Sequence, residues 1–451
     1  MTRTLPHSRE ERSGGKLLLP YAEMAMGLFI VVVGLKLPFG SLRTMAMLAL
    51  CGLVTIYGIL RNPYAPLYCF AFITPISKAF GTDFALMFGS LVAVWLRRDI
   101  CQWRWRFSLP GTAYCLWGVA SLLWAGEIFT DWDSWIAQAL GPMLLAFLVA
   151  GLRDTTFRRN LMLLVTVACC IGIIFSFRNW HAGTGEYGSG GRFYALIPPD
   201  PFSAWILFGL FSAIAWLADG GAPVWLRCCL LASIPWQVLG LGLCGFRAAI
   251  LAAALGVVMV GICLRRLAKL TGLLTLAAIP VVAAAVLIPG LFNTLLGRFG
   301  TIATDQGSDR LVIWAGALKK FWDHPFIGYG LDNFKALTGG FYGDEMMPHS
   351  IYVGTLVELG AVGAVLLLVW MAVLLRKAWR AQERVWIFPL MVAFSFQAMF
   401  LHEFYFPCFW LAIALVEGAR LRAPALVGTR RWRQLPEEAG PELSVPVGQL
   451  N

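Results

Sequence analysis

Long apolar runs alternate with short polar connections over most of the chain. A helix that crosses a bilayer needs about 20 consecutive apolar residues. Some runs reach this length, and the shorter ones are typical of tilted, re-entrant or broken membrane helices. The pattern predicts about twelve to fourteen membrane-spanning helices. The candidate runs are 17–37, 45–60, 66–80, 84–96, 111–124, 135–152, 161–177, 202–217, 228–244, 248–264, 270–288, 351–375, 386–400 and 406–416.

Composition supports this interpretation. Of the 451 residues, 59% are hydrophobic and 14% are charged, whereas a soluble domain averages about 25% charged residues. This excludes a soluble globular enzyme and a disordered chain. The sequence therefore predicts an all-α integral membrane fold. A polytopic domain over 17–418 follows an N-terminal segment, 1–16, and precedes a basic, then Pro/Glu-rich tail, 419–451, which is predicted to be disordered.

The basic residues behind the net charge of +11 gather in connections on one side of the predicted membrane. If the N-terminus is cytoplasmic, the positive-inside rule is satisfied, because nearly every basic cluster falls in a connection on the same side. Both termini are then predicted to be cytoplasmic, and the charge does not indicate nucleic-acid binding. These clusters are Arg61; Arg97, Arg98, Arg104 and Arg106; Arg153, Arg158 and Arg159; Arg227; Arg265, Arg266 and Lys269; Arg376, Lys377, Arg380 and Arg384; and Arg420 to Arg433 in the tail.

Two connections on the outward side are long, 178–201 and 289–349, and long ordered loops usually carry function. The outward side keeps Arg192, Arg247, Arg310 and His349. Without ATP there, a reaction needs a substrate that is already activated, and arginine's planar fork suits phosphate oxygens. The residues predict a phosphorylated, lipid-linked substrate. Two simpler interpretations stay open: Arg247 as a snorkelling interfacial anchor and Arg192 as a solvated loop residue.

The segment 308–322 predicts an amphipathic helix with Ser308 as N-cap and Pro325 after its end. Arg310 in its first turn, together with the helix dipole, would form an anion site. Such a helix either lies flat on the outer leaflet or packs on the bundle. Its expected apolar stripe is Leu311, Trp314, Leu318 and Phe321.

The stretch His349-Ser350, nine residues, Gly360, two residues, Gly363 resembles the signature of the O-antigen ligase and O-antigen polymerase superfamily. That signature is His, then Asn, Ser or Gln, nine residues, Gly, two residues, then Gly, Thr or Tyr. Arg247-Ala-Ala-Ile-Leu251 is similar to the family's Arg-x-x-x-Leu motif.

Two further stretches extend the resemblance over roughly 180–420. Arg310, followed by Ile313-Trp314 and by His324-Pro-Phe-Ile-Gly-Tyr-Gly330, resembles the family's large-loop pattern ahead of the histidine. Arg192 before Pro198–Pro201 is similar to the earlier loop arginine. The family's usual Asn after the proline is Phe202 here.

The resemblance implies a C-type glycosyltransferase-like fold with a large helical periplasmic loop. It implies a metal-independent, inverting enzyme without a cofactor, in the inner membrane of a bacterium. Its partners would be membrane lipids, an undecaprenyl-diphosphate-linked glycan donor and an acceptor hydroxyl at the periplasmic face. The acceptor is lipid A core for a ligase, or another lipid-linked repeat for a polymerase, for example of an exopolysaccharide. The sequence decides neither between these nor the oligomeric state.

The same resemblance assigns roles to the outward residues. Arg247 and Arg310 would neutralise the charge of the diphosphate leaving group, and Arg192 would bind the substrate. His349, with an ordinary pKa near 6.5, would act as general base on the acceptor hydroxyl or hydrogen-bond the diphosphate. Both roles stay open.

Other candidate sites have less specific signals. Asp131-Trp-Asp133, near Glu127, has the D-x-D form of metal-binding nucleotide-sugar transferases, but acidic outward loops are common. His402-Glu403 precedes an aromatic run, so it either contacts acceptor or lipid or forms an interfacial turn. The 11 cysteines show no zinc-ligand spacing.

Two other functions would suit a polytopic chain. A transporter, such as a flippase for a lipid-linked glycan, tends to show two related halves and charged or broken helices near the midplane. No internal repeat is evident here, and the polar candidates gather on one side, which favours the enzyme. A scaffold of a secretion assembly would not need arginines and a histidine on one face.

Overall fold

The computed structural model describes residues 20–37, 41–76, 82–125, 140–152, 154–182, 197–219, 221–264, 272, 310–342, 346–402 and 406–422. Within these ranges every named element is helical, and one isolated antiparallel bridge joins Ala381 to Leu421. The predicted all-α membrane fold is confirmed. The helices are α1 (Tyr21–Lys36), α2 (Ser41–Leu60), α3 (Ala65–Ile73), α4 (Thr82–Leu96), α5 (Arg98–Cys101), α6 (Leu109–Ala120), the 3₁₀ turn η2 (Ser121–Leu123), α8 (Gly141–Gly151), α9 (Thr155–Ala182), α10 (Pro199–Asp219), α11 (Val224–Cys244), α12 (Arg247–Leu264), α15 (Arg310–Phe321), α16 (Phe334–Tyr342), α17 (Ile351–Arg380), α18 (Arg384–Gln397) and α19 (Pro407–Glu417).

The predicted apolar runs coincide with these helices, except for 270–288, which lies outside the described helices. Six of the described helices, α2, α9, α10, α11, α12 and α17, are long and apolar enough to cross a membrane. The run 66–80 contains only the nine-residue α3, whose residues are all buried. At 1.5 Å per residue it measures about 14 Å, too short to cross. The count of twelve to fourteen crossings stays a prediction.

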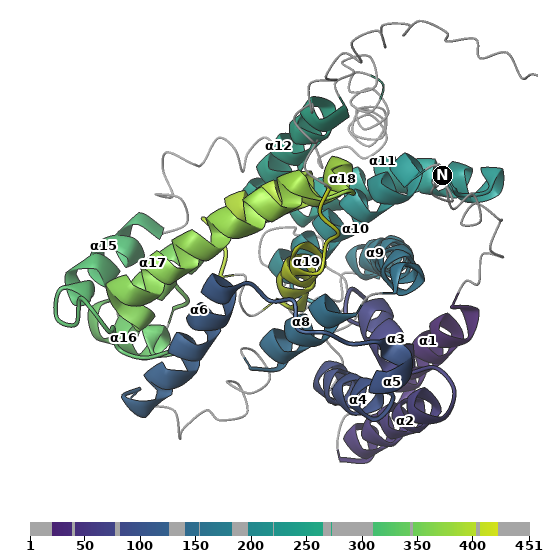
Figure 1. The fold of residues 1–451 in the computed structure, drawn as a ribbon, viewed down its shortest axis with the longest axis horizontal. Helices are drawn as coiled ribbons and strands as arrows, with labels where there is room; N and C mark the ends of the chain where they lie inside the picture. Colours follow the sequence, from purple (N-terminus) through teal and green to yellow (C-terminus); the bar gives the residue numbers. More distant parts are fainter. Residues whose placement is uncertain are drawn as a thin grey trace, which may run out of the picture.

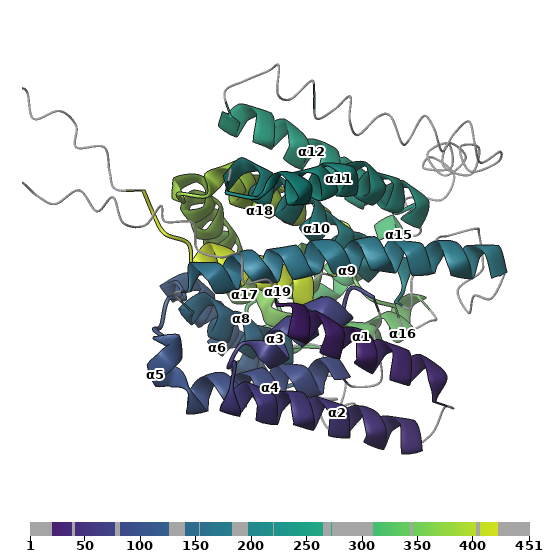
Figure 2. The same cartoon turned by 90° about the vertical axis from the view of Figure 1, so that its right-hand side faces the viewer.

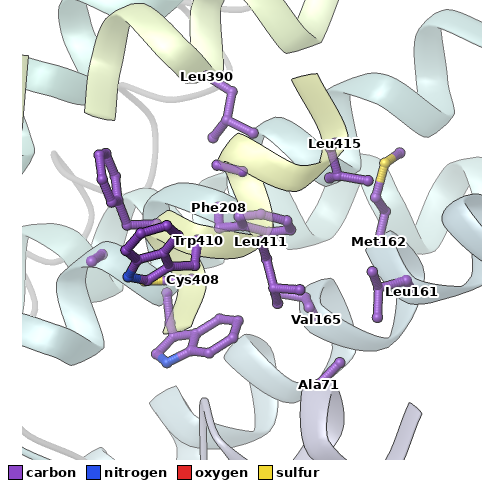
Figure 3. Close-up of a cluster of buried hydrophobic side chains, with 14 of the residues drawn as sticks. Ala71, Leu161, Met162, Val165, Phe208, Leu390, Cys408, Trp410, Leu411 and Leu415 are labelled. Carbon is purple, nitrogen blue, oxygen red and sulfur yellow. The ribbon is translucent and has the colours of Figure 1, made fainter. Parts of the chain in front are cut away.

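The helices form three layers (Figure 2), with α1 to α4 on one side, α9 and α19 in the middle, and α11 and α12 on the other. The short helix α19 lies at the centre (Figure 1), and its residues from Cys408 to Glu417 are all buried. Its core neighbours come from four helices (Figure 3): Ala71 of α3, Leu161, Met162 and Val165 of α9, Phe208 of α10, and Leu390 of α18. A helix that is apolar all round is buried on all sides.

The longest described helix, α17, is interrupted at Gly360, whose φ of 67° and ψ of −171° are not helical. The loop between α15 and α16 supplies the hydrogen bonds that this break leaves open. Ala361 N donates to Pro325 O at 2.8 Å, and Gly330 N donates to Glu358 O at 2.7 Å. An added Cβ at Gly360 would collide with the carbonyl of Phe326. The glycine is therefore required both for its backbone conformation and for this close approach.

The predicted amphipathic helix is present as α15, and it packs on the bundle, beside α16 and α17 (Figure 1). The expected stripe is wrong in part. Ile313 and Ala317 are fully buried, and Trp314 and Phe321 pack beside them against Phe334 and Val357. Leu311 and Leu318, in contrast, are exposed. The helix thus has two apolar faces, and one of them packs inward.

Candidate functional site

His349 stands immediately before α17 in a left-handed backbone conformation, with a φ of 48°. This region is uncommon for residues other than glycine. Neighbouring contacts hold the segment. Ser350 is the N-cap of α17 and accepts a hydrogen bond from Val353 N at 3.4 Å. On the other side, the indole Nε1 of Trp314 donates to the carbonyl of Pro348 at 2.8 Å. The residue after the histidine is therefore a helix cap, a role that suits serine.

Arg310 approaches the turn that contains Arg247. Its guanidinium carbon lies 5.9 Å from the ring centroid of Phe246. Phe246 connects α11, which ends at the left-handed Gly245, to α12, whose first residue is Arg247. The contact therefore brings Arg310 close to the turn that precedes Arg247, although the two arginines are far apart in the sequence. Arg247 is the first residue of α12, which has no acidic residue in its first turn, and Arg310 is the first described residue of α15.

The electrostatic surroundings of His349 combine three effects. Burial lowers the pKa of His349 below its ordinary 6.5, the positive charge of Arg310 lowers it further, and the negative charge of Asp200 acts in the opposite direction. Asp200 lies in the first turn of α10. The imidazole is therefore neutral at pH 7, which is the form able to accept a proton.

His402 lies behind this segment, between α18 and α19. It is 6% exposed, and an added Cβ on Gly354, in the first turn of α17, would meet its ring at 2.8 Å. Burial lowers the pKa of His402 to about 3, while a hydrogen bond with the backbone of Ser350 acts in the opposite direction. His402 is thus a neutral, buried neighbour of the His349 segment.

Glu358 joins the large loop to α17. It is 2% exposed, and its carboxylate Oε1 accepts a hydrogen bond from Phe334 N at 3.2 Å. Phe334 begins α16, where the next residue is Lys335. Lys335 is near enough to His402 to lower its pKa. One buried carboxyl group thus links the start of α16 to the first half of α17.

Comparison with protein families adds an independent observation. Residues 231–368 match the sequence model of a family described as O-antigen ligase. The match covers about a third of the chain, from within α11 to within α17. It contains Arg247, Arg310, His349 and Gly360, whereas Asp200 and His402 lie outside the matched range. No curated protein matched the chain.

This match confirms the resemblance to the O-antigen ligase and polymerase superfamily and supports glycan transfer of the O-antigen ligase type in general. Together with the apolar helices it indicates a multi-pass membrane protein with glycosyltransferase-like activity. A family of this kind implies a lipid-linked glycan donor and a glycan acceptor.

The predicted site residues have different outcomes. Arg310 and His349 are near neighbours, and the contact of Arg310 with Phe246 brings the Arg247 turn beside them. His402 lies near this group, but its side chain is buried. Arg192, Glu403, Asp131 and Asp133 lie outside the described residues. Among the residues that the structure describes, no group of three or more His, Cys, Asp or Glu has metal-binding geometry.

Sequence reasoning missed Asp200 and Trp314 as members of the site. In the sequence, Asp200 lies between two of the prolines that follow Arg192, and Trp314 belongs to the expected apolar stripe. No local pattern connects Asp200 with His349, which follows it by 149 positions. One local signal for Asp200 exists. An acidic residue stabilises the N-terminal end of a helix, so its position predicts a carboxylate at the start of α10.

Proposed function

We propose that this protein transfers a glycan from undecaprenyl diphosphate to an acceptor hydroxyl at the periplasmic face of the inner membrane. The observation that carries the proposal is the convergence of Arg310, the Arg247 turn and the neutral His349 within the segment that matches the O-antigen ligase family. Lipid A core would be the acceptor of a ligase, and another lipid-linked repeat that of a polymerase.

Arg247 and Arg310 are the proposed diphosphate ligands. A cation at a helix N-terminus is unfavourable for the helix, because the N-terminal end of the dipole is positive. Arg247 begins α12, whose first turn contains no acidic residue. Arginine side chains and helix N-termini both bind anions, so the same arrangement suits a diphosphate. Its negative charge would be stabilised as the leaving group departs, which is an electrostatic contribution to catalysis.

His349 is the proposed general base. The neutral imidazole takes the proton of the acceptor hydroxyl while that oxygen attacks the anomeric carbon of the donor sugar. The bond from this carbon to the diphosphate oxygen breaks, and undecaprenyl diphosphate leaves with the electron pair. Attack opposite the leaving group inverts the anomeric centre. Burial, and after it the charge of Arg310, lower the pKa of His349 and so favour the neutral imidazole before the reaction, which suits this role.

The other polar residues have supporting roles in this proposal. Asp200 would stabilise the imidazolium formed when His349 accepts the proton. His402, which is buried against Gly354 and the Ser350 backbone, would hold the His349 segment in place. The predicted substrate contacts of Arg192 and Glu403 remain part of the proposal. The outward side is supported by the distribution of basic residues.

Deletion of the gene in its host, followed by gel analysis of surface glycans, tests the acceptor. Lipid A core without long chains would indicate a ligase. Core capped by one repeat, or loss of an exopolysaccharide, would indicate a polymerase. A second assay separates the enzyme from a flippase. Purified protein in detergent, mixed with donor and acceptor, is expected to form the glycosidic bond, and a protein that only moves lipid between leaflets would form none.

A further inference from the structure

The side of α15 that faces away from the bundle is apolar. We define the α15 outer face as Leu311, Val312, Leu318, Trp322, Phe326 and Ile327, from the helix and the loop that follows it. Trp322 is 74% exposed, Phe326 72% and Leu311 60%. Leu311, Leu318 and Trp322 recur at helical spacing, so they lie along one side. The opposite side, with Ile313 and Ala317, is already buried against α16 and α17.

This surface is too apolar for a helix that is surrounded by water. Single exposed hydrophobic residues are common, but a contiguous patch of large ones marks a contact with another apolar phase or partner. Packing of α15 on the bundle does not need these side chains, because the inward face supplies its own cluster with Phe334 and Val357. The outer face is therefore left available for a contact outside the bundle.

The α15 outer face is continuous with the lipid-facing side of α17. Phe326 O accepts a hydrogen bond from Val362 N at 3.3 Å, so the loop touches α17 just after the Gly360 break. From Val362 onward α17 exposes further apolar side chains at helical spacing, namely Val365, Leu368 and Val369. Because α17 is long and apolar enough to cross a membrane, this row faces lipid, and the outer face extends it.

Charged residues at the same place match a membrane interface. Lys319 is exposed beside Leu318, and Lys320 pairs with Asp323 at 3.3 Å, both half exposed. Lysine next to tryptophan and phenylalanine is typical of the zone where lipid headgroups meet acyl chains. Lysine at this depth also attracts anionic headgroups. These charges argue against burial in the hydrocarbon core and favour the interface.

We propose that the α15 outer face is a membrane-contact surface that rests in the interface of a phospholipid bilayer, beside the spanning helices. The inference is independent of the proposed chemistry, since it depends only on exposure and on continuity with α17. The two predicted placements of this helix, on the outer leaflet and on the bundle, are then compatible. One face of α15 packs on the protein, and the other contacts lipid.

Site-specific photocrosslinking tests this surface. The full-length protein carries p-benzoyl-phenylalanine at position 322 or, separately, at 326, and is reconstituted in vesicles of phosphatidylethanolamine and phosphatidylglycerol. Both positions are exposed and aromatic, so the probe is tolerated. Val365 serves as the lipid-facing reference, and Gln382, exposed in the turn after α17, serves as the polar control. Irradiated protein is digested, and mass spectrometry measures the fraction of each peptide that carries a phospholipid.

Phospholipid adducts at 322 and 326, at yields comparable with Val365 and well above Gln382, are the expected result. Adducts at Val365 alone would overturn the proposal. So would crosslinks from 322 and 326 to another part of the chain or to a second protein, or adducts formed only with an added polyprenyl diphosphate. Because the two positions are probed in separate variants, a fault in one variant leaves the test intact.

Discussion

The indole Nε1 of Trp314 donates a hydrogen bond to the carbonyl oxygen of Pro348 at 2.8 Å. This contact joins α15, which begins with Arg310, to the segment that carries His349. One side chain thus links the helix of the proposed diphosphate ligand to the segment of the proposed base. Trp314 is a positioning residue in this interpretation.

Trp314→Phe is expected to lower turnover with little change in protein yield. Loss of a hydrogen bond of this kind costs about 1 kcal/mol, which corresponds to roughly a fivefold loss in kcat if the alignment is used in the transition state. Trp103→Phe is the matched control, because its Nε1 also donates to a helix carbonyl, that of Leu148, at 3.1 Å. Equal kcat losses in the two variants would show that Trp314 acts only through stability.

Removing either proposed diphosphate ligand is expected to abolish most glycan transfer. Arg310→Ala and Arg247→Ala should each lower kcat by about 100-fold or more, as for a lost electrostatic contact to a leaving group. Membrane insertion, measured by the amount in the washed membrane fraction, should be unchanged. Arg227→Ala, an exposed arginine at the other end of α11, is the control. Full activity in Arg247→Ala and Arg310→Ala would exclude the diphosphate clamp.

The rate of transfer is expected to increase with pH through a pKa below 6.5. Burial and Arg310 lower the pKa of His349, so the protonated, inactive form is populated only under acid conditions and the rate is constant at neutral pH. Measurement of kcat between pH 4.5 and 8 checks this. The variant Arg310→Lys keeps the positive charge near His349, so its kcat should still fall at acid pH. His349→Gln should lose the limb together with most of the activity; wild-type turnover across pH would rule out the base role.

The break in α17 is expected to be intolerant of a side chain. Gly360→Ala forces a non-glycine residue to a φ of 67° and a ψ of −171° and pushes a Cβ into the carbonyl of Phe326. Strain of this kind costs about 1–3 kcal/mol before the clash is counted, so the Tm should fall. Gly118→Ala in α6 is the control, because no atom lies within 4 Å of its added Cβ. A Tm for Gly360→Ala as high as that of the control would contradict the glycine requirement.

Metal removal is expected to leave transfer unchanged. The proposed chemistry uses arginine side chains to neutralise the diphosphate, so EDTA should not lower the rate of purified protein. Loss of activity that Mg²⁺ or Mn²⁺ restores would instead implicate the Asp131-Trp-Asp133 pattern. In that case the double variant Asp131→Asn, Asp133→Asn would also lose activity. In the proposed mechanism the double variant keeps full activity.

Much of the fold was predictable because it depends on local pattern. The length of an apolar run decides whether a segment can be a membrane helix, and the described helices coincide with the predicted runs. Ser350 and Gly360 were identified from the sequence signature. The structure adds the physical reason for each: serine caps α17, and only glycine fits the break.

The tertiary structure decided which residues meet. Helix α15 has apolar residues at two sets of positions that both satisfy helical spacing, so periodicity could not select Ile313 and Ala317 as the packed side. Asp200, in the first turn of α10, and His402, in the connection between α18 and α19, approach the His349 segment from distant positions in the sequence. The sequence by itself determined the apolar helices, their breaks and the chemical types of the candidate residues, because these depend on neighbours along the chain. Packing alone decided the partners of His349 and which face of α15 became the α15 outer face, because both depend on which helices lie side by side.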